Sequence, residues 1–299
     1  MALYVMEGCE YKMPGKNLPG WGWVISSKGM TTVIFDGRAV AAKRQAAVKE
    51  KVAELTRAAG EITLASIFFA EDTGSVLYTR LKRQAALAAG LKFKQHSFSM
   101  ADSDLVVVAD VVHRLEAERS VVGIIIQKPT RVAWRQAYVG QLSFDAWWDT
   151  VTGYLSVGRD VDCVKRENLS RLSTDASARL PATVKAVLLV LEEAGLGDME
   201  GLTVSIVGCS DILGAPLADV LERQGCQVTR HCDTIDPAAL AEAKVVVSAT
   251  GRPDSITGSM IASGAVVVDV GAPQGDVKAA SVMGRARWLT PVPGGVGPL

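Results

Sequence analysis

The sequence lacks several features that mark specialised classes of protein. No apolar run reaches the length of a membrane-spanning helix, because the richest one, Ala186–Leu191, is followed at once by two glutamates. Glu7, Glu10 and Lys12 interrupt any apolar core near the start, so a signal-peptide layout is missing. The 32 basic and 32 acidic side chains cancel. No overall field therefore favours a nucleic acid or an anionic membrane as partner.

Cysteine is scarce and shows no pairing pattern. The chain has 5 cysteines, an odd number without CxxC spacing: Cys9, Cys163, Cys209, Cys226 and Cys232. This pattern argues against both a disulfide framework and a structural zinc site. It predicts reduced thiols in a cytoplasmic protein.

The composition is that of a soluble globular protein, with 48% apolar and 21% charged residues. A length of 299 residues suits two domains of ordinary size. The first 30 residues contain prolines and tryptophans without periodicity, and they are interpreted as an irregular extension of unassigned function.

Beyond this extension, strand-like and helix-like segments alternate in two series. The first series includes a strand at 62–69, a helix at 75–89 and a strand at 121–126; the second starts near Pro181. Such alternation predicts parallel sheets built from βαβ units. We therefore expect an α/β fold with a domain at 31–178, a Rossmann-like domain at 179–299 and a cleft between them.

A candidate nucleotide-binding turn lies in the second series. The strand Thr203–Val207 leads into Gly208 and Gly214, and Pro216 follows at the start of a helix. Exposed N–H groups at such a helix start favour a pyrophosphate. The spacing is not GxGxxG, so an ordinary turn between strand and helix explains these residues about equally well.

The candidate catalytic residues lie in the first series. Tyr78 and Lys82 are four residues apart on a predicted helix and share one face, an arrangement that suits a planar substrate needing proton transfer. Gln127 ends a buried strand, where sites of open α/β sheets form. Asp160 and Asp162 lie on one face of an extended segment. Each feature alone also fits a structural role, as a surface lysine, a strand end or turn-forming aspartates.

The last ten residues, Thr290–Leu299, hold three prolines and three glycines and follow a short predicted strand at 286–289. Neither a helix nor a strand suits that composition. The segment is either a disordered tail or a rigid loop at the carboxyl end of a strand.

Taken in order, these segments resemble motifs of the bifunctional methylenetetrahydrofolate dehydrogenase/methenyltetrahydrofolate cyclohydrolase family. The end resembles its PGGVGP loop, and Ser75–Lys82 resembles SxxYxxxK. The strand end at Gln127 resembles VQLP, residues 159–163 resemble KDVDG, and residues 208–216 resemble GRSxxVGxP. Members of the family continue past PGGVGP into a further helix, whereas this sequence ends at Leu299.

The resemblance implies the roles of individual residues on the folate side. Lys82 would be the cyclohydrolase lysine, Gln127 would tune it, Tyr78 would stack on the folate ring and Asp162 would hydrogen-bond the pterin. Pro293, Gly294 and Gly295 would close the substrate side of the site.

On the cofactor side, the resemblance implies a site formed by Gly208, Cys209, Ser210, Gly214, Arg230, Asp233 and Ala272. Cys209 stands where the family usually has arginine, which could neutralise a 2′-phosphate. Arg230 or His231 could face such a phosphate, whereas Asp233 could accept a hydrogen bond from the free 2′-hydroxyl of NAD. The family favours NADP, and NAD stays possible.

The implied function is oxidation of 5,10-methylenetetrahydrofolate with NADP, followed by hydrolysis of the methenyl product to 10-formyltetrahydrofolate. The implied partners are tetrahydrofolate derivatives and a second copy of the chain, without nucleic acid or membrane. The alternatives are a monofunctional NAD-dependent dehydrogenase and a non-catalytic nucleotide- or folate-binding homologue.

Overall fold

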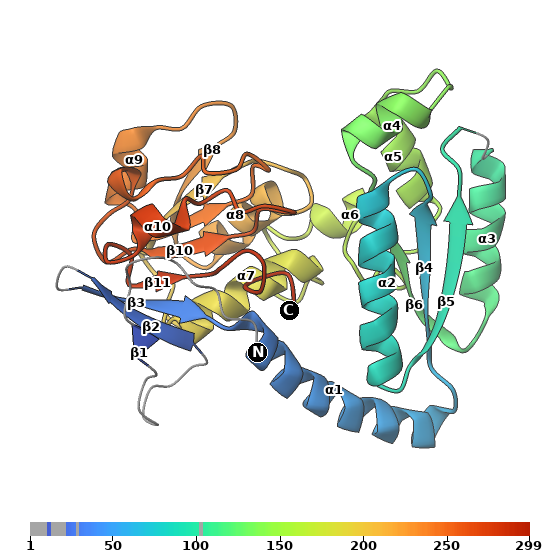
Figure 1. The fold of residues 1–299 in the computed structure, drawn as a ribbon. Coiled ribbons are helices and arrows are strands. Elements are labelled where there is room, and N and C mark those ends of the chain that lie inside the picture. Colours follow the sequence, from blue (N-terminus) through green and yellow to red (C-terminus); the bar gives the residue numbers. More distant parts are fainter. Residues whose placement is uncertain (1–10, 13–21, 28–29, 102–103) are drawn as a thin grey trace. The chain divides into compact units, whose positions relative to one another are not determined.

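The chain folds into two compact units. The structure, a computed structural model, describes residues 11–12, 22–27, 30–101 and 104–299 (Figure 1). One unit combines residues 1–42 with 182–299, and the other spans residues 43–181. Among the described residues, no helix is both long and apolar enough to cross a membrane.

The unit at 43–181 contains a three-stranded parallel sheet in the order β5-β4-β6. Its strands are β4 (Thr63–Phe69), β5 (Lys92–Phe98) and β6 (Val121–Ile126). Its helices are α2 (Thr73–Ala88), α3 (Leu105–Ala117), α4 (Arg131–Ala137), α5 (Phe144–Gly153) and α6 (Arg166–Leu169). The connections through α2 and α3 cross the sheet in opposite directions, so right-handed crossovers place these helices on opposite faces.

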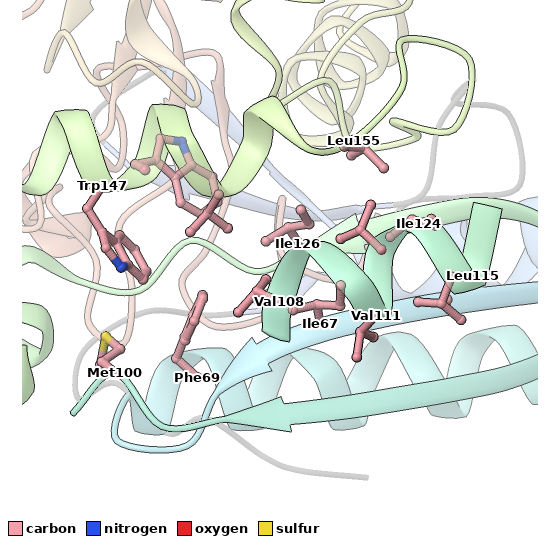
Figure 2. Packing of buried hydrophobic residues seen from close by; sticks show 14 of the residues in the cluster. Ile67, Phe69, Met100, Val108, Val111, Leu115, Ile124, Ile126, Trp147 and Leu155 are labelled. Atoms are coloured by element: carbon pink, nitrogen blue, oxygen red, sulfur yellow. The ribbon is translucent and has the colours of Figure 1, made fainter. Parts of the chain in front are cut away.

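The core of this unit lies between the sheet, α3 and α5 (Figure 2). Ile67 and Ile126 bring apolar side chains from the strands, and Val108 and Val112 bring them from α3. Trp147 of α5 is buried with its ring centroid 4.8 Å from that of Phe69.

The other unit is built on an eight-stranded sheet in the order β1-β2-β3-β11-β10-β9-β7-β8. The strands are β1 (Tyr11–Lys12), β2 (Gly22–Ser27), β3 (Met30–Phe35), β7 (Thr203–Val207), β8 (Gln227–His231), β9 (Val245–Ser248), β10 (Val266–Asp269) and β11 (Trp288–Leu289). The helices are α7 (Ala182–Glu193), α8 (Gly214–Arg223), α9 (Pro237–Glu242), α10 (Ala279–Val282) and the 3₁₀ turn η1 (Gly258–Met260). From β3 to β8 every pairing is parallel, which confirms the expected Rossmann-like architecture.

The described part of the first 30 residues is not irregular, contrary to the sequence-based expectation. Strand β2 pairs antiparallel with β3 from Gly22↔Phe35 to Ser27↔Met30, and β1 pairs with β2. The β-forming residues Trp23, Val24 and Ile25 have the free edge of β3 to pair with, a tertiary partner that local periodicity does not reveal. The remainder of this segment lies outside the described residues.

The division into units also differs from the sequence-based boundaries. Residues 31–42 belong with the C-terminal sheet, because β3 pairs in parallel with β11 through Val33↔Trp288 and Ile34↔Leu289. Helix α1 (Gly37–Ala59) then carries the chain from one unit into the other. A contact between strands so distant in sequence cannot be inferred from alternation alone.

Asp72 fixes the start of α2 and links it to Thr130, the residue that caps α4. Its carboxylate accepts a hydrogen bond from the Ser75 amide at 2.7 Å, which caps the helix, and two more from the amide and hydroxyl of Thr130. Burial alone would raise the pKa of Asp72, but these hydrogen bonds outweigh burial and hold the pKa below its usual value of 3.8. The cap therefore stabilises the fold only while it is ionised.

We expect Asp72→Ala to lower the free energy of unfolding by about 2–4 kcal/mol, since a helix cap and hydrogen bonds to a buried carboxylate are lost together. Because the folded pKa lies below the unfolded one, the stabilisation is present above about pH 4 and is lost as the pH falls through the folded pKa. Urea unfolding at a series of pH values measures the difference between wild type and variant, which should shrink in acid.

Asp104→Ala is the matched control, because Asp104 caps α3 through the Val106 amide alone and is exposed. Its loss should cost only about 1 kcal/mol. Equal losses for the two variants would contradict the linking role of Asp72.

Candidate active site and cofactor pocket

Helix α2 presents Tyr78 and Lys82 one turn apart, as their spacing predicts. Tyr78 is 43% exposed, an unusually open setting for a large ring. The Lys82 ammonium donates a hydrogen bond to Asp162 Oδ2 at 2.8 Å, across 80 residues of sequence. The structure thus brings together two of the predicted site residues, Lys82 and Asp162, and places the exposed Tyr78 one helical turn before the lysine.

The loop that carries Asp162 is fastened to the sheet. The Ile124 amide of β6 donates to the Arg159 carbonyl at 2.8 Å, and Ile124 and Asp160 form an isolated parallel bridge. A side chain at Gly123 would place its Cβ 2.4 Å from Val161, so glycine there leaves room for the loop. Cys163, which follows Asp162, has a φ of 56° and meets the requirement for a left-handed residue without being glycine.

The two neighbouring aspartates differ in role, whereas the sequence placed them together on one face. Asp160 is fully buried and accepts hydrogen bonds from the amides of Val164 and Lys165 and from Asn168 Nδ2. It organises the loop, while Asp162 meets the lysine. The difference arises because the chain turns after Asp162, as the dihedral angle of Cys163 records.

Gln127 follows β6, and its side chain is only 8% exposed. Its amide donates to the Ile67 carbonyl, which continues the sheet by one residue. Its side-chain Nε2 is buried and has no hydrogen-bond partner among the described residues. A buried amide group of this kind is costly unless another molecule or a movement satisfies it.

The next residue, Lys128, is only partly exposed. Its ammonium lies over the rings of Phe144 and Trp148, 5.3 and 5.2 Å from their centroids.

The C-terminal loop is ordered in the unit that contains β11. The Gly37 amide donates to the Gly294 carbonyl at 3.0 Å, and the Gly295 amide donates to the Pro291 carbonyl at 2.8 Å. Gly294 has a φ of 108°, and a Cβ at Gly37 would lie 1.8 Å from the Gly295 carbonyl oxygen. Of the two sequence-based alternatives, the structure therefore has the rigid loop, with Pro293 exposed on it.

A pocket of about 250 Å³ opens at the carboxyl ends of β7, β8 and β9. Gly208, Cys209 and Ser210 line it from the turn after β7; His231 to Ile235 line it from the end of β8. Gly208 has a φ of 106°, and a Cβ at Gly214 would lie 1.8 Å from the Gly208 carbonyl oxygen. The turn and the start of α8 can therefore meet only because both residues are glycine.

Cys209 and Cys232 form a disulfide, which corrects the prediction of reduced thiols. The cause is the register of the sheet, since Val207 lies opposite His231 and the two cysteines follow these partners on adjacent parallel strands. Their Cα atoms are 4.9 Å apart. A spacing of 23 residues carries no pairing signal until the topology is known.

Some of the ionisable residues around the pocket are bonded to other parts of the protein or buried, and others are exposed in the pocket wall. Arg230 hydrogen-bonds Glu222 and Asp219 of α8, and these bonds raise its pKa. His231 is buried, which lowers its pKa and keeps the imidazole neutral near pH 7. Asp233 lines the pocket and is exposed. Among the described residues that line this pocket, Arg252 is the single lysine or arginine.

Two buried carboxylates hold the loops that follow β9 and β10. Asp276 accepts hydrogen bonds from the Ser248 hydroxyl and the Thr250 amide, and Asp269 accepts them from the amides of Gly271, Asp276 and Val277. Burial raises the pKa of Asp269 in spite of these bonds. Ala272 is exposed on the loop that they fix, beside a cis peptide bond to Pro273.

Both parts of the chain match models of known protein families. Residues 35–142 match the catalytic domain of tetrahydrofolate dehydrogenase/cyclohydrolase, and residues 181–299 match the NAD(P)-binding domain of the same enzymes. The chain belongs to this family.

Individual relatives agree with the family over most of their length. The bifunctional protein FolD 2 of Geobacter metallireducens is 35% identical over 279 residues, which cover 90% of this chain and 93% of that protein. The solved FolD structure from Campylobacter jejuni has a TM-score of 0.79 at 28% identity, with 88% and 92% of the two chains covered. That of Trypanosoma brucei, complexed with NADP cofactor and inhibitor, has a TM-score of 0.79 at 30% identity, with 89% and 92% covered.

Three aspartates that hold the loops around these sites were not identified as site residues from the sequence, namely Asp72, Asp269 and Asp276. Each is an aspartate at or after the carboxyl end of a strand, and that shared placement is the signal that could have found them. Their hydrogen bonds to loop amides become visible only with the loops in place.

We expect Gly214→Ala to raise the KM for the nicotinamide cofactor at least about tenfold, because the new methyl group displaces the turn that lines the pocket. Gly197→Ala is the matched control in the same unit, since a Cβ there meets nothing within 4 Å. Steady-state kinetics of both variants measure the effect, and a normal KM for Gly214→Ala would exclude the turn from cofactor binding.

Proposed function

We propose that this protein oxidises 5,10-methylenetetrahydrofolate to 5,10-methenyltetrahydrofolate with NADP and then hydrolyses that product to 10-formyltetrahydrofolate. The observation that carries the proposal is the 2.8 Å ion pair of Lys82 and Asp162, beside an exposed tyrosine, in a chain of this family. The NADP-bound relative from Trypanosoma brucei supports the choice of acceptor.

The hydrolytic step requires proton transfer, and Lys82 is the group assigned to it. Water adds to the methenyl carbon of the cation and loses one proton, which leaves a hydroxyl group on that carbon. The bond from this carbon to one ring nitrogen then breaks, the hydroxyl gives up its proton to become the formyl C=O, and the released nitrogen takes up a proton, so that one proton is released overall. An amine on a half-buried stem can accept and return a proton, and the Asp162 carboxylate holds the ammonium form in place at 2.8 Å.

The other predicted residues bind and orient the substrate. The exposed ring of Tyr78 offers a face on which a pterin stacks. The buried Nε2 of Gln127 has no partner within the described part of the chain, which suits a hydrogen bond made only when the substrate or the neutral lysine is in place. Asp162 also accepts a hydrogen bond from the pterin.

The residues around the pocket at β7, β8 and β9 fit a dinucleotide. The turn from Gly208 to Gly214 has no room for side chains at its two glycines, so a ligand can approach the backbone. Arg252 supplies a positive charge for phosphate, and Asp233 lies at the strand end where the ribose of such cofactors binds. When bound, the nicotinamide accepts a hydride from the substrate, and the protein contributes by orienting the two rings.

The monofunctional NAD-dependent dehydrogenase is the less favoured reading, because hydride transfer needs no acid or base from the protein, whereas Asp162 holds the Lys82 amine in place at 2.8 Å. A cytoplasmic location and a homodimer complete the proposal. Light scattering on the purified protein measures its mass in solution and so tests for the homodimer.

We expect Lys82→Ala to slow methenyl hydrolysis by at least about a hundredfold, the usual contribution of a positioned acid or base, while oxidation of methylenetetrahydrofolate continues. Reduced-cofactor absorbance reports oxidation, and decay of the methenyl chromophore reports hydrolysis in the same sample.

Lys92→Ala is the control, because Lys92 is an exposed lysine near Glu61 in the same unit. It should leave both rates unchanged. Wild-type methenyl decay in Lys82→Ala would remove that residue from the mechanism, and a wild-type protein without either activity would overturn the function itself.

A further inference from the structure

The disulfide between Cys209 and Cys232 lies in the wall of the cofactor pocket. Both cysteines line the cofactor pocket, one from the turn after β7 and the other from the end of β8. The strands that they follow are already joined by a continuous parallel ladder, and the Gly208 amide donates to the His231 carbonyl at 2.9 Å. The bond therefore adds no new strand pairing, and both of its cysteines lie in the wall of the pocket.

In a dinucleotide-binding fold, the adenosine ribose lies at the end of the second strand, which is β8 here. The bridge places two sulfur atoms without hydrogen-bond donors at that point, next to the Asp233 carboxylate. Arg230, the nearest cation in sequence, is held by Asp219 and Glu222. At this strand end the Asp233 carboxylate suits a free 2′-hydroxyl and opposes a 2′-phosphate, while Arg252 lines the same pocket from the loop after β9.

The bridge is also open to reagents. Cys232 is exposed and Cys209 is partly exposed, whereas Cys226 is buried. Exposed disulfides are the ones that thiols reduce readily. Reduction would leave two S–H groups, which are weak donors, and would release the turn and the strand end from the covalent link.

We propose that the Cys209–Cys232 disulfide is a reversible redox gate that disfavours a cofactor carrying a 2′-phosphate and admits that cofactor once it is reduced. The proposal rests on the proposed function in taking this pocket as the nicotinamide-cofactor site. NADP affinity rises on reduction, while NAD affinity changes little.

The chemistry is a thiol–disulfide exchange with a dithiol as reductant. A thiolate of the dithiol attacks the exposed Cys232 sulfur, forms a mixed disulfide and displaces the Cys209 thiolate, which takes up a proton. The second thiol of the reductant then closes its own ring and releases Cys232 as a thiol. Two electrons and two protons pass from the dithiol to the bridge.

The test is a pair of cofactor titrations on wild-type protein, one after oxidation and one in excess dithiothreitol, with heat of binding as the signal. A peptide map without reductant first establishes the link between Cys209 and Cys232. We expect the Kd for NADP to fall about fivefold on reduction, less than the tenfold or more of a strong hydrogen bond to a charged group, because S–H is a weak donor. The Kd for NAD should stay within about twofold.

The variants Cys232→Ser and Cys209→Ser should both bind NADP as the reduced wild type does, and dithiothreitol should not change their Kd. Cys226→Ala should respond as wild type does, because burial beside Glu200 raises the pKa of that thiol to about 11 and keeps it out of exchange. The wild-type titrations decide the matter even where a variant does not fold.

An unchanged NADP-to-NAD ratio, a weaker NADP affinity on reduction or a different cysteine pairing in the peptide map would each overturn the gate. The outcome is separate from that of the proposed function, because binding is measured without folate. Protein that oxidised methylenetetrahydrofolate equally in both redox states would keep the function and lose the gate.

Discussion

The ion pair between Lys82 and Asp162 is the contact on which the account of this protein depends. It joins a helix to a loop 80 residues away, and both sides are fixed independently. Asp72 caps the helix and holds it to Thr130 at the start of α4, while Asp160 accepts hydrogen bonds from the amides of the loop. These two structural aspartates thus position Asp162 against Lys82, and the amine stays partly exposed to solvent.

In the unit with the larger sheet, close backbone packing and two buried carboxylates together fix the loops around the pocket. Close packing of Gly208 against Gly214 shapes the turn, and Asp269 and Asp276 pin the loops that follow the neighbouring strands. The pocket is therefore defined by loops that cannot spread independently. The disulfide at its rim is the one covalent element in this arrangement, and its place beside Asp233 makes cofactor choice depend on the state of two sulfur atoms.

The local features of this structure could be predicted from the sequence, whereas the features that depend on contacts between distant segments could not. Helix α2 and the spacing of Tyr78 and Lys82 follow from local periodicity, and the glycine turn follows from its place between β7 and α8. The disulfide, the pairing of β3 with β11 and the different fates of Asp160 and Asp162 all require knowledge of which distant segments meet. Sequence patterns report local conformation, whereas these features arise from strand register and from loop anchoring.

A double-mutant cycle on methenyl hydrolysis tests the central contact most directly. The rates of Lys82→Ala, Asp162→Asn and the combined variant are compared in single-turnover experiments with wild type. If the two side chains act as one unit, the combined variant should be no slower than Lys82→Ala within about twofold. Losses that add up in full would mean that the lysine and the aspartate act separately, and would contradict the account.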